Sequence, residues 1–228
     1  MTKGKLIVIE GLDGSGKATQ TGLLCDRLGR EFRDFFFRRI SFPDYDDPSS
    51  ALVKLYLGGQ LGGLGEVNAY GASLFYTVDR YASFLRHWGR DYREGALIIA
   101  DRYATSNIAH QMSKLPRDRW DDYLSWLEET EYRRVGLPRP DLVVYLDMEP
   151  EVSKKLLSRR YAGDEGKRDL HEADFAYLLG CREAALYGAE KLGWQLIRCC
   201  DGEEPFSPDL IAGKVWQAVS LILKEVSK

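Results

Sequence analysis

The sequence lacks the features of a membrane, secreted or disulfide-stapled protein. No apolar run approaches the ~20 residues that a membrane span needs, and the first residues pass straight into a short strand-like run without a secretory cleavage site. The cysteines form no CxxC pair and have no histidine at a zinc-binding spacing: Cys25, Cys181, Cys199 and Cys200. We therefore expect a cytoplasmic protein with reduced thiols and no membrane contact.

The sequence also lacks an excess of charge of either sign. It has 32 basic and 35 acidic residues and a formal net charge of -3. Nothing in this balance predicts a polyanion such as a nucleic acid as partner, and any phosphate that the protein handles should be small. With 228 residues, of which 44% are hydrophobic, the chain can bury a core without staples, and we expect one domain over residues 1–228.

Short runs rich in Val, Ile and Leu alternate with longer helix-like segments, which is typical of βαβ units and a parallel sheet. The expected strands are Lys5–Glu10, Phe36–Phe42, Ala96–Ala100, Leu142–Leu146 and Trp194–Cys200. Helices should begin at Gly16, after Pro48, at Glu66, near Asp118, at Pro150, after Asp169 and at Pro208. Glycines predict two loops, Leu57–Gly65 and Tyr161–Asp169.

A phosphate-binding loop (P-loop) lies between the first strand and the first helix. It reads Gly11-Leu12-Asp13-Gly14-Ser15-Gly16-Lys17-Ala18-Thr19. Its glycines allow consecutive N–H groups to point at phosphate oxygens, and the helix N-terminus adds partial positive charge. Lys17 would reach the β- and γ-phosphates of ATP, and we expect its side chain to be solvated without ligand. The pattern predicts that this loop binds a nucleoside triphosphate, with ATP as the cofactor.

One position departs from the P-loop pattern. The residue after the lysine is usually Ser or Thr, which ligates Mg²⁺, and here it is Ala18, whose methyl group cannot bind a metal. Thr19 points about 100° away around the helix and is no obvious substitute. Asp101, at the carboxyl end of an apolar strand, is the natural acidic group for the metal, and pairing with Arg102 is its alternative role.

Further motifs indicate which kind of molecule receives the phosphoryl group. Phe42-Pro43 ends the second expected strand, Phe75-Tyr76 precedes Asp79-Arg80 on a helix, and Asp101-Arg102-Tyr103 continues to Ser106-Asn107. In order and spacing, over essentially the whole chain, these motifs resemble the thymidylate kinase family, which phosphorylates dTMP. The resemblance implies a five-stranded parallel sheet flanked by helices on both faces, ATP and Mg²⁺ as cofactors, and a homodimer.

The resemblance also implies roles for residues of the acceptor site. Asp13 is similar to an acid that contacts the 3′-hydroxyl of the acceptor, and Arg102 to the arginine that binds its phosphate, for which a guanidinium fork is well suited. Phe42 and Pro43 belong to the same site. Tyr76, or Phe75 if the register slips, would stack on the pyrimidine, and the polar residues beside the base would be Arg80, Ser106 and Asn107.

Gly14 implies the family subtype that supplies a catalytic arginine from a lid rather than from the P-loop. The expected lid lies at about residues 159–172, and its candidate arginines are Arg159, Arg160 and Arg168. Such a loop would neutralise charge over the γ-phosphate and exclude water. Any one of these arginines is equally well explained as a solvated surface residue.

Two differences from the family concern the acceptor. The family usually has an arginine two positions after Phe-Pro, where this chain has Tyr45, and an aromatic near the sugar, where this chain has His110. We expect phosphoryl transfer from ATP to a nucleoside monophosphate, with dTMP as the best single candidate. A kinase for another deoxynucleotide or a deoxynucleoside is the alternative suggested by Tyr45, and a low-turnover nucleotide-binding module is the one suggested by Ala18.

Overall fold

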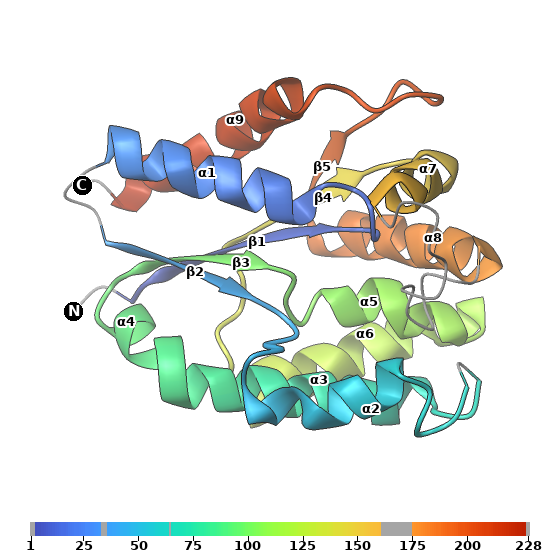
Figure 1. Ribbon diagram of the computed structural model, residues 1–228. Coiled ribbons are helices and arrows are strands. Elements are labelled where there is room, and N and C mark those ends of the chain that lie inside the picture. Colours follow the sequence, from blue (N-terminus) through green and yellow to red (C-terminus); the bar gives the residue numbers. More distant parts are fainter. Residues whose placement is uncertain (1–2, 33–35, 64, 161–174, 227–228) are drawn as a thin grey trace.

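The computed structural model describes residues 3–32, 36–63, 65–160 and 175–226. They contain a five-stranded sheet of parallel strands in the order β2-β3-β1-β4-β5 (Figure 1). The strands are β1 (Lys5–Gly11), β2 (Phe37–Ser41), β3 (Leu97–Asp101), β4 (Leu142–Asp147) and β5 (Gln195–Arg198). The predicted α/β class and the five predicted strands are confirmed, with every strand end within two residues of its expected place.

Two helices, α1 (Lys17–Glu31) and α9 (Pro208–Val226), cover one face of the sheet (Figure 1). Ile7 and Ile9 of β1 pack with their apolar side chains in one buried core. Gly16 is the N-cap of α1, as expected for the helix that follows the P-loop. The first strand and the first helix are therefore held rigidly on either side of that loop.

The helices between β2 and β4 lie on the opposite face (Figure 1). Leu6 and Val8 point to this face, because successive strand residues alternate, and pack there with Phe84 and Trp88. The longer helical segments are α2 (Ala51–Leu57), α3 (Ala69–Ser83), the π-helix η2 (Phe84–Trp88), α4 (Gly89–Arg93), α5 (Ser106–His110), α6 (Trp120–Glu128) and the π-helix η5 (Glu129–Arg134). Short 3-10 turns include η3 (Met112–Lys114) and η4 (Arg117–Arg119). In the described part of the chain, no helix is long and apolar enough to cross a bilayer.

The observed helix starts agree with the predicted ones after Pro48 and at Pro150, where η1 (Pro48–Ser50) and α7 (Pro150–Arg160) begin. The start predicted at Glu66 is three residues too early. Asn68 caps α3 by accepting a hydrogen bond from the Gly71 N–H at 2.8 Å, so the helix begins after it.

Helix α8 (Phe175–Leu192) contacts both α5 and α7. The loop predicted at Tyr161–Asp169 lies outside the described residues, as does the helix start predicted after Asp169. The carboxyl ends of β1, β3 and β4 meet at one edge of the sheet, and this is where parallel α/β folds bind their ligands.

Candidate active site

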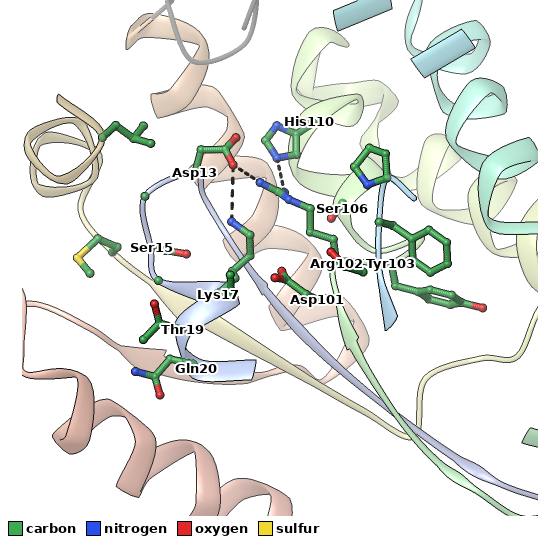
Figure 2. Close-up of a pocket in the computed structure, with 18 of the residues that line it drawn as sticks. Asp13, Ser15, Lys17, Thr19, Gln20, Asp101, Arg102, Tyr103, Ser106 and His110 are labelled. Carbon is green, nitrogen blue, oxygen red and sulfur yellow. Dashed lines mark hydrogen bonds and ion pairs between the residues drawn. The ribbon is translucent and has the colours of Figure 1, made fainter. Parts of the chain in front are cut away.

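A cavity of about 920 Å³ opens at the carboxyl edge of the sheet (Figure 2). The P-loop lines one end of it, and β3, α3 and α5 line the other. The predicted residues that line this cavity are Asp13, Gly14, Ser15, Gly16, Lys17, Ala18, Thr19, Phe42, Pro43, Tyr76, Arg80, Asp101, Arg102, Ser106 and Asn107. The fold therefore brings most of the predicted donor and acceptor residues to one cavity.

The P-loop needs glycine at Gly14 for two reasons. Its φ is 81°, in the left-handed region, and a Cβ there would lie 2.7 Å from the carbonyl oxygen of Ser153 on α7. Gly11 and Leu12, also predicted to bind ATP, do not line the cavity. Leu12 is fully buried, and its carbonyl accepts a hydrogen bond within the loop instead.

The expectation that Lys17 is solvated is wrong. Only 7% of the residue is exposed, its Nζ donates to the Leu12 carbonyl at 2.8 Å, and it lies 3.7 Å from the Asp13 carboxylate. Burial, followed by the nearby positive charge of Arg102, lowers the pKa of the Lys17 amine to about 8. The free protein thus holds this lysine in place with its own backbone before a nucleotide arrives.

Arg102 lies at the end of the cavity that is predicted to bind the acceptor, hereafter the acceptor end. Its φ of 67° is unusual for a residue with a side chain, and its N–H donates to the Ile9 carbonyl at 3.1 Å, which fixes the turn after β3. One arm of the guanidinium pairs with Asp13, and the other lies 3.1 Å from Nε2 of His110 (Figure 2). Burial lowers the pKa of Arg102, but the Asp13 carboxylate and other nearby carboxylates raise it above its ordinary value.

Asp101 has the properties of a magnesium ligand. It lines the cavity at 7% exposure, and its carboxylate makes no hydrogen bond to the described residues; Asp13, rather than Asp101, pairs with Arg102. The described residues contain no group of three or more metal-binding side chains. Asp101 can therefore provide one oxygen to a Mg²⁺ ion, and nucleotide phosphates and water would complete its shell, as is usual for Mg²⁺.

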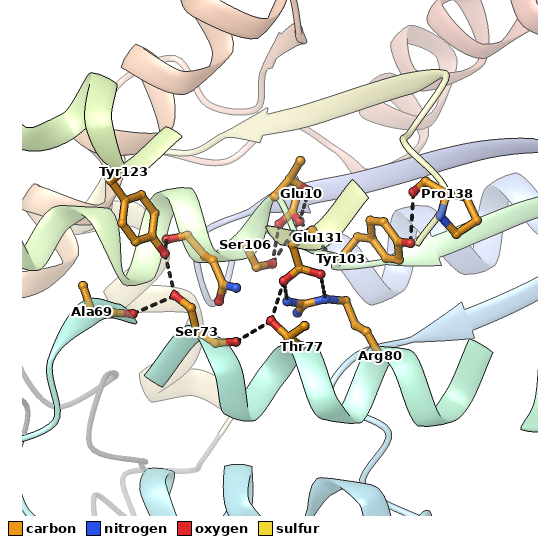
Figure 3. Close-up of polar contacts among 12 residues, drawn as sticks. Glu10, Ala69, Ser73, Thr77, Arg80, Tyr103, Ser106, Tyr123, Glu131 and Pro138 are labelled. Carbon is orange, nitrogen blue, oxygen red and sulfur yellow. Dashed lines mark hydrogen bonds and ion pairs between the residues drawn. The ribbon is translucent and has the colours of Figure 1, made fainter. Parts of the chain in front are cut away.

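A buried ion pair supports the side of the cavity that is predicted to bind the base (Figure 3). Arg80 of α3 is 1% exposed and contacts both carboxylate oxygens of Glu131, which is fully buried. Tyr76, one turn earlier on α3, lines the cavity beside Arg80. Phe75 does not; its ring packs against Tyr56 with centroids 6.2 Å apart.

Helix α5 carries the remaining polar groups. The Ser106 hydroxyl donates to the Glu10 carboxylate at 2.8 Å (Figure 3), whereas the Nδ2 of Asn107 is buried and has no partner in the part of the chain that the structure describes. Sequence reasoning missed Gln111, one turn after Asn107. It lines the cavity and is fully buried, and neither its Oε1 nor its Nε2 has a hydrogen-bond partner among the described residues. Buried amides without partners are rare, and both residues border the cavity although these amide atoms are themselves covered.

The predicted lid lies largely outside the described residues. Arg168 is not among them, and Arg159 and Arg160 are described only as the last residues of α7, without their side chains. Their predicted catalytic and ATP-binding roles stay predictions.

A P-loop on a parallel sheet, facing a second set of cationic and polar side chains across one cavity, defines a P-loop nucleotide kinase. A family model described as thymidylate kinase matches residues 9–197. The chain belongs to the thymidylate kinase family.

Curated relatives agree with this assignment. The chain is 31% identical to the thymidylate kinase of Mycobacterium tuberculosis over 175 residues, which are 74% of this chain and 78% of that protein. It is 33% identical to the Schizosaccharomyces pombe enzyme over 153 residues, covering 66% of this chain and 64% of that one. The fold is similar to that of a thymidylate kinase from Candida albicans, with a TM-score of 0.72, 22% identity, and coverage of 99% of this chain and 94% of the other.

Proposed function

We propose that this protein transfers the γ-phosphoryl group of ATP to dTMP, which yields dTDP and ADP. The observation that carries the proposal is the single cavity that joins the P-loop lysine, Lys17, to a buried acceptor arginine, Arg102. Curated relatives of this chain are thymidylate kinases, and this supports dTMP as the acceptor. With both phosphates bound in this one cavity, as proposed, transfer can occur without release of an intermediate.

In the proposed reaction, an oxygen of the acceptor phosphate attacks the γ-phosphorus in line. The new P–O bond forms as the bond to the bridging oxygen breaks, and ADP leaves with that electron pair. Lys17 follows the charge that develops on the transferred group, and Arg102 holds the attacking phosphate. Arg159, Arg160 and Arg168 are the proposed lid cations that exclude water.

Magnesium is part of the proposal, with Asp101 as its protein ligand. When bound, the ion would neutralise phosphate charge and orient the γ-phosphate. Ala18 provides no hydroxyl for it, so we expect the protein to bind the metal weakly without nucleotide.

The base is proposed to lie between Tyr76 and the polar groups of α3 and α5. Tyr76 offers a ring face, and Arg80 offers a guanidinium already oriented by Glu131. The amides of Asn107 and Gln111, which have no partner among the described residues, are proposed to turn toward the bound base and to donate to and accept from a pyrimidine edge. A base that satisfies them removes the cost of leaving them unpaired, about 1–3 kcal/mol each.

A turnover screen tests the proposed acceptor. ADP formation would be measured with Mg·ATP and each common nucleoside monophosphate or deoxynucleoside in turn. We expect the highest kcat/KM with dTMP. A higher value with another deoxynucleotide or a deoxynucleoside would establish the alternative suggested by Tyr45, and ADP formation that does not depend on any acceptor would contradict the kinase function.

We also propose that the chain forms a homodimer through α3 and η2. Leu74, Val78, Tyr81 and Leu85 recur at helical spacing and are 46%, 51%, 40% and 58% exposed, which makes one apolar stripe. Sedimentation of wild type should give twice the mass of the 26.0 kDa chain, and Val78→Lys should give a monomer. Leu221→Lys, at a 67% exposed position on α9, is the control and should remain dimeric.

A further inference from the structure

His110 lies between the acceptor arginine and a buried cysteine, and its neighbours select one tautomer of its imidazole. The residue ends α5 and is 7% exposed. Its Nε2 is 3.1 Å from Nη1 of Arg102 (Figure 2). A guanidinium nitrogen can only donate, so Nε2 must accept and the ring proton must be on Nδ1, which lies 3.8 Å from Sγ of Cys181.

Most of the groups around the imidazole favour its neutral form, and the Asp13 carboxylate, which pairs with Arg102, opposes them. Arg102 is a permanent cation in direct contact with it. On α8, burial raises the pKa of the Cys181 thiol to about 12 and that of the Tyr177 hydroxyl well above its ordinary value, so both are neutral. Tyr177 is held by donating to the His110 carbonyl at 2.5 Å. Lys114, from the following 3-10 turn, is a second cation near Cys181.

Arg102 is held on both of its arms. Nη2 pairs with Asp13 and Nη1 donates to His110, so the plane of the guanidinium is fixed by two partners from different segments. Protonation of the imidazole would place an N–H against an N–H at this contact, with like charges about 3 Å apart. That arrangement removes one of the two partners and repels the guanidinium.

We propose that neutral His110 is a positioning residue that orients Arg102 for the acceptor phosphate, and that protonation of His110 in mild acid releases Arg102 and weakens acceptor binding. The inference rests on the proposed role of Arg102 in binding that phosphate. Because burial and the contact with Arg102 oppose protonation of the imidazole, the effect should grow as the pH falls from about 8 to 5.5.

The kinetic test compares the KM for dTMP with the KM for ATP between pH 5.5 and 8. The acceptor phosphate itself titrates near pH 6, so wild type is compared with His110→Gln, which can still accept a hydrogen bond but cannot be protonated. We expect the wild-type KM for dTMP to rise about tenfold more than that of His110→Gln as the pH falls, with similar KM profiles for ATP. Identical dTMP profiles in the two proteins would overturn the proposal.

A second variant separates positioning from packing. His110→Phe keeps the bulk of the ring but removes the acceptor atom, so the KM for dTMP should be raised about tenfold at every pH, with a smaller change in kcat. An unchanged KM in a variant with a wild-type melting temperature would contradict the proposal.

A measurement on the free protein tests the contact between His110 and Arg102 independently of the proposed reaction. The chain has 3 histidines, so the ¹⁵N imidazole signals of His110 can be assigned by substitution. We expect a protonated Nδ1 and an unprotonated Nε2 at pH 7.5, and loss of this preference in Arg102→Ala. An Nε2–H tautomer would refute the contact even if dTMP were the substrate. The expected tautomer combined with no turnover of dTMP would refute the proposed function alone.

Discussion

The two ends of the cavity are built in different ways. At the donor end, seven consecutive residues from Gly11 to Lys17 form the loop, and the Lys17 amine is held by a carbonyl of that same loop. At the acceptor end, each important side chain is held by a residue distant in sequence: Arg80 by Glu131, 51 positions away, and Arg102 by Asp13, 89 positions away. The geometry of the donor end is therefore determined within one segment of the chain, whereas the geometry of the acceptor end depends on how distant segments fold together.

This difference determines what a substitution should do. Replacing the Lys17 side chain at the donor end removes a phosphate contact and leaves most of the surrounding packing intact. A change at the acceptor end also leaves a buried partner without its counterpart, so effects on stability and on binding are combined there. The following predictions test this distinction, beginning with the largest expected effect.

Lys17→Met should lower kcat by at least about a thousandfold, because it removes the cation that follows the transferred phosphoryl group. The free energy of unfolding should change by less than about 1 kcal/mol, because burial disfavours the charged amine and offsets its hydrogen bond to the Leu12 carbonyl and its 3.7 Å ion pair with Asp13. Steady-state kinetics and chemical denaturation check the two parts. A large loss of stability would show that the donor end is also part of the scaffold.

Glu131→Ala should destabilise the protein by about 3–5 kcal/mol, because it leaves the guanidinium of Arg80 buried without a counter-charge. Glu129→Ala is the matched control: Glu129 lies in the same π-helix, is 39% exposed, and pairs only with solvent-exposed arginines. It should cost less than about 1 kcal/mol. Urea denaturation measures the loss of unfolding free energy in each variant. Equal losses in the two would mean that burial does not determine the strength of the ion pair between Arg80 and Glu131.

Arg102→Ala should weaken dTMP binding by about 1.5–3 kcal/mol, the usual contribution of a charge-assisted hydrogen bond, and leave ATP binding nearly unchanged. Calorimetric titration of each ligand measures the two affinities separately. If ATP and dTMP were weakened equally, Arg102 would belong to both ends of the cavity.

ATP binding should take up a proton above pH 8. Lys17 has a pKa of about 8 in the free protein, and the phosphates of a bound nucleotide should raise it, so the affinity for ATP should fall as the pH rises from 8 towards 10. Calorimetry at pH 9 in two buffers of different ionisation enthalpy measures the uptake. The same experiment at pH 7 should show no uptake from Lys17, and equal uptake at both pH values would assign the proton to another group.

Ala18→Ser should lower the Mg²⁺ concentration that gives half the maximal rate by about two- to threefold, because it adds the hydroxyl ligand of other P-loops. Asp101→Asn should raise that concentration. Magnesium titrations at fixed ATP measure both. A wild-type rate that persists in excess EDTA would rule out a metal requirement, and unchanged values in both variants would exclude both side chains from the metal shell.

The sequence predicted the donor end well because its information is local. A strand, three glycines and a lysine at fixed spacing determine the loop, and Gly14 and Gly16 have the positive φ angles that the pattern requires. The burial of Lys17 was not predictable in this way. It depends on how closely Asp13 and Arg102 approach Lys17 in the folded protein, and the spacing of residues along the chain does not indicate those distances.

The acceptor end was only partly predictable. The family resemblance located Arg80 and Arg102, but nothing in the spacing connects Arg80 to Glu131. Helix α5 has five residues, too few for a periodic pattern, so Gln111 was missed, although its position one turn after Asn107 was a usable signal. Tyr76 rather than Phe75 lines the cavity because Tyr76 and Arg80 lie four residues apart on one face of α3.

The contact between the P-loop and α7 limits how the protein could be re-engineered. A Cβ at Gly14 would lie 2.7 Å from the backbone oxygen of Ser153 and 3.0 Å from the Leu157 side chain. Because the first of these is backbone, no rotamer change can make room for it. Moving a catalytic arginine into the loop at this position would require the whole of α7 to shift away, so conversion to the other subtype would demand coordinated changes in the loop and the helix rather than a single substitution.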